Sequence, residues 1–263
     1  MNGLLPLSIF IITKNEADRI GQTLKSIEGL ANEILVVDSG STDNTCEIAK
    51  QFGAKVIVNA PFPGYGPQKR YAEEQCQYDW ILNLDADEVV STDLFKEIVS
   101  LFSTPHKMGK LYSVRIIDIL PHENSYRWYT YSKRPVRLYN RLYNQYSNST
   151  VHDRVKVTKN EKILKLKAPL LHYSVLSINH FVSKLERYAK MLATDYALKK
   201  RQVHPIRLAT ELPLAFIKCY FGRRYVFRGI NGFLMAMIYA HYRLTRLIKI
   251  IELQNKLFIQ KKR

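Results

Sequence analysis

Cysteine is scarce in this sequence of 263 residues, which contains only Cys46, Cys76 and Cys219. The three residues form no CxxC pair and no other metal-binding spacing. A cysteine-based metal site is therefore excluded. An odd, scattered set of cysteines is typical of a protein from a reducing cytoplasm.

Long hydrophobic runs are also missing. The longest apolar stretch lies near Phe233 to Tyr242, contains His241, and is too short to cross a bilayer. The N-terminus has no basic region and passes directly into strand-like sequence, so we expect neither a transmembrane helix nor a signal peptide. Without internal repeats or a low-complexity linker, the length predicts one large domain or one domain with an appendage.

Acidic residues are few in the second part of the chain. Residues 1–105 contain 8 Lys+Arg and 15 Asp+Glu, whereas residues 106–263 contain 32 and 8, and 14 of the 17 tyrosines lie after residue 105. The net charge of +17 is therefore concentrated in a basic, aromatic portion. Such asymmetry predicts an anionic partner, either a nucleic acid or an anionic membrane surface.

The pattern of apolar residues predicts an α/β fold. Short β-branched or apolar runs, which predict buried strands, occupy residues 7–13, 33–38, 55–59 and 80–84. Helical spacing follows each of them, and this alternation is typical of a doubly wound parallel sheet. Later strands are expected at 110–118, 136–139, 151–157 and 162–173, and helices at 177–201, 206–221 and 229–257. We therefore expect a catalytic domain over 1–175, with halves 1–105 and 106–175, and a basic helical extension over 176–263.

Carboxylates stand just past the predicted strand ends. Asp85, Ala86, Asp87 and Glu88 follow the run that begins at Trp80. If the extended backbone continues, Asp85 and Asp87 share a face and repel each other, and a divalent cation such as Mg or Mn would relieve that repulsion. The competing interpretation is a set of solvated loop acids. Glu16 and Asp38 also follow strands, and ligands of doubly wound sheets bind at these strand ends, which favours a functional site.

Together these motifs resemble the family 2 inverting glycosyltransferases of GT-A fold. The matching segments are Ile12-Thr13-Lys14-Asn15-Glu16, residues 36–45 (VVDSGSTDNT), Gln68-Lys69-Arg70 and Asp85-Ala86-Asp87-Glu88. The later segments are similar to the subgroup that adds glucose to the inner core of bacterial lipopolysaccharide. They are Arg137-Leu138-Tyr139, Val151-His152-Asp153 and Leu171-His172-Tyr173-Ser174. Members of the subgroup often carry Glu where this chain has Asp153.

The resemblance implies a GT-A fold with a doubly wound mixed sheet, a helical C-terminal extension and an active site for a UDP-sugar. Asp38 would accept a hydrogen bond from uracil, Glu16 would lie near the nucleoside, Asp85 near the ribose or metal, and Asp87 on the metal. Lys69 or Arg70 would contact the phosphates. The implied nucleotide-sugar residues are Thr13, Asn15, Glu16, Asp38, Ser39, Gln68, Lys69, Asp85, Ala86 and Asp87.

Residues of the second part supply the remaining candidates. Asp153 is the expected general base because only eight acids follow residue 105 and several of those lie on predicted helices. Its alternative role is a surface ion pair with Arg154. His172 is either a further metal ligand or a buried core histidine. Candidates for acceptor binding are Arg134, Arg137 and His152, and solvated edge positions are the alternative for the two arginines.

The expected function is metal-assisted transfer of a hexose, glucose by the subgroup likeness, from a UDP-sugar to a lipopolysaccharide core or other lipid-linked glycan. The basic helices predict peripheral attachment to an anionic membrane, at the cytoplasmic side of the inner membrane, and no nucleic-acid partner. The alternative is a non-catalytic protein on the same scaffold that binds nucleic acid or an anionic membrane. That alternative leaves the strand-end carboxylates unexplained.

Overall fold

The computed structural model describes residues 3–104, 109–121, 123, 126, 129–149, 153–198 and 203–260. The chain forms two compact units. The first contains residues 1–118 and 132–174, and the second contains residues 119–131 and 175–263.

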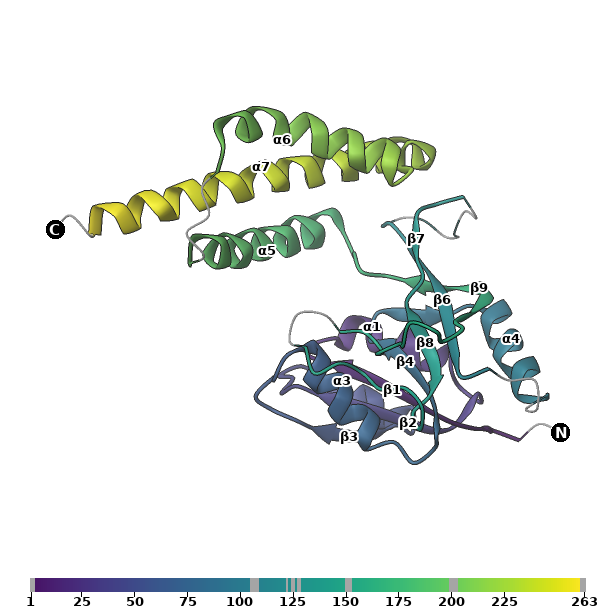
Figure 1. Ribbon diagram of the computed structural model, residues 1–263. Coiled ribbons are helices and arrows are strands. Elements are labelled where there is room, and N and C mark those ends of the chain that lie inside the picture. The colour runs from purple at the N-terminus through teal and green to yellow at the C-terminus, as the bar shows by residue number, and fades with distance from the viewer. Residues whose placement is uncertain are drawn as a thin grey trace. The chain divides into compact units, whose positions relative to one another are not determined.

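A nine-stranded mixed sheet forms the centre of the first unit (Figure 1). Its strand order is β3-β2-β1-β4-β8-β6-β9-β5, and β7 pairs with β6. The strands are β1 Leu5–Thr13, β2 Ala31–Asp38, β3 Lys55–Val58, β4 Trp80–Asp85, β5 Glu88–Val90, β6 Leu111–Asp118, β7 Ser132–Lys133, β8 Val136–Asn140 and β9 Leu164–His172. The helices of this unit are α1 Ala17–Lys25, α2 Thr45–Gln51, α3 Tyr65–Glu74 and α4 Thr92–Phe102.

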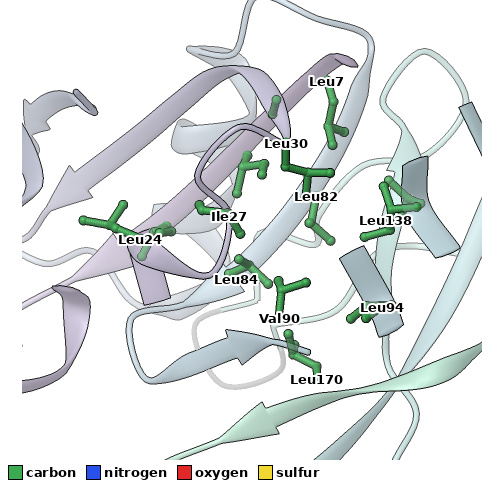
Figure 2. Close-up of a cluster of buried hydrophobic side chains, with 14 of the residues drawn as sticks. Leu7, Leu24, Ile27, Leu30, Leu82, Leu84, Val90, Leu94, Leu138 and Leu170 are labelled. Carbon is green, nitrogen blue, oxygen red and sulfur yellow. The ribbon is translucent and has the colours of Figure 1, made fainter. Parts of the chain in front are cut away.

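The first four strands in this order run parallel because α1, α2 and α3 return the chain between them. Alternate residues of β1 pack on opposite faces of the sheet. Leu7 and Ile11 belong to the apolar cluster that contains Leu24 and Leu94, shown in Figure 2. Phe10 faces the other cluster with Ala72 of α3. The two-residue period of the strands thus buries both faces, which explains the continuous apolar runs in the sequence.

Most predicted elements of the first unit are confirmed, and the differences have local causes. Helix α3 begins at Tyr65, earlier than expected, because Pro67 is tolerated in a first helical turn. The strand expected at 151–157 is wrong over its described residues, which contribute only an isolated bridge from Val155 to Tyr146. Strands β5 and β7 have three and two residues, too few for a periodic pattern.

The second unit is helical. It contains α5 Ile178–Leu198, α6 Pro205–Ile217, a π-helical turn Lys218–Gly222, a 3₁₀ turn Tyr225–Arg228 and α7 Gly229–Gln260. Both α5 and α6 pack against α7 (Figure 1). None of the helices in the described ranges combines the length and the apolar composition needed to cross a membrane.

Candidate active site

Two loops at the carboxyl ends of β1 and β2 are joined by hydrogen bonds. The Oδ2 atom of buried Asp38 accepts hydrogen bonds from the backbone N–H groups of Gly40 at 2.8 Å and Ser41 at 2.7 Å. Asn15, in the left-handed region with φ 54°, accepts from the N–H of Thr42 through Oδ1 at 2.8 Å. Gly40 also has a positive φ, of 85°, a conformation in which glycine is the favoured residue. These bonds give the Asp38 loop one defined shape.

The same edge includes the other predicted residues of the nucleotide-sugar set. Ser39 donates its N–H to the carbonyl oxygen of Thr13 at 2.9 Å. Gln68 of α3 is buried and donates through Nε2 to the Ser39 hydroxyl at 3.1 Å. The N–H of Glu16 donates to the Thr45 hydroxyl at 2.8 Å. The structure therefore brings Thr13, Asn15, Glu16, Asp38, Ser39 and Gln68 to one edge of the parallel strands.

Asp85, at the end of β4, lies between two cations. Its Oδ1 is 2.9 Å from Nζ of Lys69, and its Oδ2 is 2.8 Å from a guanidinium nitrogen of Arg137. Burial opposes ionisation of Asp85, but Arg137 and then Lys69 outweigh it and hold the pKa of this carboxyl well below its usual range. The repulsion expected between the acids of this segment is thus relieved at Asp85 by protein cations.

Asp85 and Asp87 do not share a face, contrary to the expectation from an extended backbone. Strand β4 ends at Asp85, and Ala86 and Asp87 form a turn. Asp87 consequently points to other partners, a guanidinium nitrogen of Arg19 and Nε2 of His172, each 3.3 Å from the carboxylate. Burial opposes ionisation here too, but the hydrogen bond from His172 outweighs it and lowers the pKa of Asp87.

His172 connects Asp87 to a second carboxylate. Its Nδ1 lies 2.6 Å from Oδ1 of Asp118, and its ring is partly exposed, so it is not a core histidine. Burial works against the charged ring, but Asp118 and Asp87 raise the pKa of His172 to about 10. A histidine that gives one ring nitrogen to a carboxylate has the arrangement typical of metal-ligating imidazoles.

Arg137 corrects an expectation. It is neither an acceptor-facing residue nor a solvated edge residue, because its side chain is buried against Asp85, Glu88 and the amide oxygen of Asn83. Burial raises the pKa of Glu88 to about 7 although Arg137 lies beside it. Arg137 therefore serves as an internal counter-charge to the acid segment.

Lys69 lies between Asp85 and Asp153, two acids for which the sequence predicted different roles. Its side chain is only 2% exposed, and its Nζ lies 2.7 Å from Oδ2 of Asp153 as well as 2.9 Å from Asp85. Burial opposes the charged form, but Asp85 first, and after it Tyr146 and Asp153, raise the pKa of Lys69 above its usual value. Asp153 is 37% exposed, so its carboxylate is fixed on one side and open to solvent on the other.

Other predicted residues lie apart from this cluster or outside the described ranges. Arg134 is exposed and donates to the carbonyl oxygen of Leu166 at 3.1 Å. His152 lies outside the described residues. Sequence reasoning missed Arg19, Asn83, Asp118 and Tyr146, whose hydroxyl donates to Asn83 at 2.6 Å. Of these four residues, only Arg19 lies next to a motif that the sequence singles out, the one that contains Glu16.

A divalent cation fits this edge only with help from a substrate. In the ranges that the structure describes, no group of three or more His, Cys, Asp and Glu side chains could hold an ion. Asp87 and His172 offer one carboxylate and one imidazole in close proximity. Mg and Mn commonly take few protein ligands and complete their shell with phosphate and water, so the pair suits an ion delivered with a diphosphate.

Comparison with known proteins identifies the family. The model of "Glycosyl transferase family 2" matches residues 8–159. An uncharacterized glycosyltransferase of Rickettsia felis is 40% identical over 94% of this chain and 89% of its own. The lipopolysaccharide core biosynthesis glycosyltransferase LpsC of Rhizobium meliloti is 29% identical over 94% and 93%. A crystal structure of S. aureus TarS with UDP-GlcNAc has a TM-score of 0.49, with 12% identity over 97% and 92% of the two chains. The chain belongs to glycosyl transferase family 2 and is a glycosyltransferase of GT-A fold.

Proposed function

We propose that this glycosyltransferase transfers a hexose, with glucose as the first candidate, from a UDP-sugar to a lipopolysaccharide core or another lipid-linked glycan, with inversion at the anomeric carbon. The name of the R. meliloti relative supports this acceptor class. The observation that carries the proposal is the Lys69 bridge, which sets Asp153 beside Asp85 at the strand edge.

The donor binds at the edge of the parallel strands in this proposal. The ordered loops of Asp38 and Asn15, with Thr13, Glu16, Ser39 and Gln68, would surround the uridine. Their hydrogen bonds to one another support a preformed pocket, because binding then costs less conformational entropy. Residues 1–105 would form the donor half of the domain and 106–175 the acceptor half, with 176–263 as the basic helical extension.

An Mg or Mn ion would be held by Asp87 and by Nε2 of His172, the latter only in the neutral form of the imidazole. When bound, the cation would act as a Lewis acid that neutralises the charge on the departing diphosphate. Asp118, through Nδ1 of His172, would keep the imidazole oriented toward the ion. Asp85 is a weaker candidate ligand because Lys69 and Arg137 already contact both of its oxygens.

Asp153 would act as the general base. The acceptor hydroxyl oxygen attacks the anomeric carbon from the face opposite the diphosphate, its proton passes to the Asp153 carboxylate, and the bond between the sugar and the diphosphate breaks. Lys69 would hold one oxygen of Asp153 at 2.7 Å, leaving the solvent-facing side for the acceptor. One base suffices for such an inverting displacement.

The donor is tested by turnover with a panel of nucleotide sugars, with and without Mg or Mn. We expect a UDP-sugar to be used and EDTA to abolish turnover. Asp87→Ala should also abolish turnover and leave the fold intact, as judged by circular dichroism. Full activity of Asp87→Ala in excess EDTA would contradict the metal role.

The base is tested with Asp153→Asn. We expect turnover to fall by about 10²–10⁴-fold, the usual contribution of a general base. UDP binding by calorimetry should be retained, because the proposed donor pocket is formed by other residues. Loss of UDP binding together with turnover would instead assign Asp153 to the donor site.

A lipid-linked acceptor implies that the enzyme acts at a membrane surface. We propose that the protein attaches peripherally to the cytoplasmic face of the inner membrane, where an anionic surface would attract the +24 charge of residues 106–263, a value that follows from 32 Lys+Arg and 8 Asp+Glu. The same positive charge would also attract a nucleic acid, so binding to duplex DNA is measured beside binding to vesicles.

A further inference from the structure

Helices α6 and α7 expose several large apolar side chains, although Met235, Leu247 and Ile250 of α7 are buried. On α6 and the turn that follows, Leu214, Ile217 and Phe221 are exposed, while Glu211, Ala215 and Cys219 are buried. The exposed residues recur at helical spacing and so form one face. In this segment larger apolar residues are exposed while an acid, an alanine and a cysteine are buried, which is unusual for a surface helix.

The first half of α7 also exposes apolar residues, although Met235 within it is buried. Its exposed apolar residues are Ile230, Phe233, Leu234 and Met237, and its fully packed positions include the small Ala236 and Ala240. Rings join the two faces: the centroid of Phe233 lies 5.6 Å from that of Phe216 and 5.9 Å from that of Tyr220. Tyr220 in turn lies 5.1 Å from Phe221. The two helices therefore present one continuous surface, which we call the hairpin patch.

The hairpin patch consists of Leu214, Ile217, Phe221, Phe227, Ile230, Phe233, Leu234 and Met237. Contiguous exposed apolar surface of this kind marks a protein or membrane interaction site.

The charge around the hairpin patch selects its partner. Residues 212–251 contain seven Lys and Arg and no Asp or Glu, and four of the seven pair with carboxylates outside this range: Arg228 with Glu123, Arg243 and Arg246 with Glu211, and Lys249 with Glu186. Lys218 and Arg224 are exposed beside the patch, and Arg224 follows the π-helical turn. A second copy of the chain would place like charges against each other, which disfavours self-association through this surface. Apolar side chains surrounded by cations suit the interface of an anionic bilayer, where rings insert among the headgroups and cations contact phosphates.

We propose that the hairpin patch is the element that inserts into the surface of an anionic membrane. This inference rests on the proposed function, because it names the surface by which the enzyme meets a lipid-linked acceptor. Phe221 and Ile230, which are 58% and 69% exposed, enter the headgroup layer, and Lys218 and Arg224 contact lipid phosphates. Neither apolar residue belongs to the catalytic machinery described above.

The experiment is flotation of the full chain with vesicles of phosphatidylcholine alone or mixed with phosphatidylglycerol, at physiological salt. We expect binding to the anionic vesicles only. Phe221→Ser with Ile230→Ser should reduce the partition coefficient by about tenfold or more, because two large apolar groups no longer leave water. Lys218→Gln and Arg224→Gln should each reduce it by about fivefold, the equivalent of about 1 kcal/mol per cation near the surface.

Matched controls lie on the first unit. Leu142→Ser removes an apolar residue that is 68% exposed, and Lys96→Gln removes an exposed cation of α4. Both should bind vesicles like the wild type. Thermal unfolding of every variant shows that the fold is retained, since surface changes of this kind usually alter stability by less than about 0.5 kcal/mol.

Three results would overturn the inference. The wild type could fail to float with anionic vesicles, or the Phe221→Ser/Ile230→Ser variant could float as well as the wild type. In the third result, the wild type binds duplex DNA or dimerises in gel filtration, and the Phe221→Ser/Ile230→Ser variant loses that property while its flotation is unchanged. UDP-sugar turnover without vesicles, measured on the same samples, separates a failure of this inference from a failure of the proposed function.

Discussion

Replacement of Lys69 by methionine is the most direct test of how the candidate active site is held together. The substitution keeps an unbranched side chain of similar length and removes the ammonium that contacts Asp85 and Asp153. Breaking a buried ion pair by removing one partner costs about 3–5 kcal/mol, because the other charge remains buried without compensation.

The structure places the expected cost for Lys69→Met at the low end of that range. Asp85 keeps its contact with Arg137 at 2.8 Å, and Asp153 is 37% exposed and can be solvated. We therefore expect the free energy of unfolding to fall by about 3 kcal/mol. Turnover should fall by about 10²-fold or more, because the base is no longer held in place. UDP affinity should change little, because the ion pairs of Lys69 are with Asp85 and Asp153 and the proposed uridine pocket is formed by other residues.

The assays are urea unfolding, steady-state kinetics and calorimetry of UDP binding on the full chain. Arg70→Met is the matched control, since Arg70 is adjacent on α3, lies 3.5 Å from the buried Glu73 carboxylate and forms its closer pair, at 2.8 Å, with Glu74, which is 54% exposed. Such surface pairs contribute at most about 1 kcal/mol. Lys69→Arg should recover part of the turnover. The reasoning is refuted if Lys69→Met is as stable and as active as Arg70→Met.

Two further predictions concern packing and pH. Gly66→Ala should destabilise the protein by about 1–3 kcal/mol and reduce turnover, because a Cβ there would overlap the carbonyl oxygens of the 147–149 segment that leads to Asp153. Gly21→Ala, where the nearest side-chain atoms are 3.7 Å away, should be neutral or stabilising by thermal unfolding. Burial opposes ionisation of Glu211, but Arg207 and Arg243 lower its pKa. The ion pairs of Glu211 therefore stabilise the folded state above the ordinary pKa of 4.5, and this contribution is lost as the pH falls below that value. Glu211→Gln should therefore cost about 2 kcal/mol at pH 7 and little at pH 3, whereas Glu186→Gln, at a carboxylate 70% exposed, should cost under about 1 kcal/mol at both. Equal losses at both pH values would contradict the ion-pair origin.

The positions of Asp38, Asp85 and Asp87 could be predicted from the sequence because they depend on local information. Each follows an apolar run that can only be buried as a strand. Parallel strands end at the same edge, so residues just past those runs converge without knowledge of the packing. The same reasoning predicted the long helices from Ile178 onward, because many turns of helical spacing accumulate into a clear pattern.

The partners of those carboxylates could not be predicted. Lys69 and Asp153 are 84 positions apart, and Arg137 and Asp85 are 52 apart. No periodic pattern relates such pairs. Lysine and arginine are normally exposed, so nothing local indicated that Lys69 and Arg137 would be buried. The turn at Ala86 was also not predicted, and because of this turn Asp85 and Asp87 contact different partners.

The sequence by itself determined where the acids of the candidate site stand, because strand ends follow from the order of apolar and polar residues along the chain. Tertiary structure alone decided which cation compensates each acid. A buried charge requires a counter-charge, and the identity of that counter-charge depends on which side chains of α3, β8 and α1 the packing brings within about 3 Å of the end of β4.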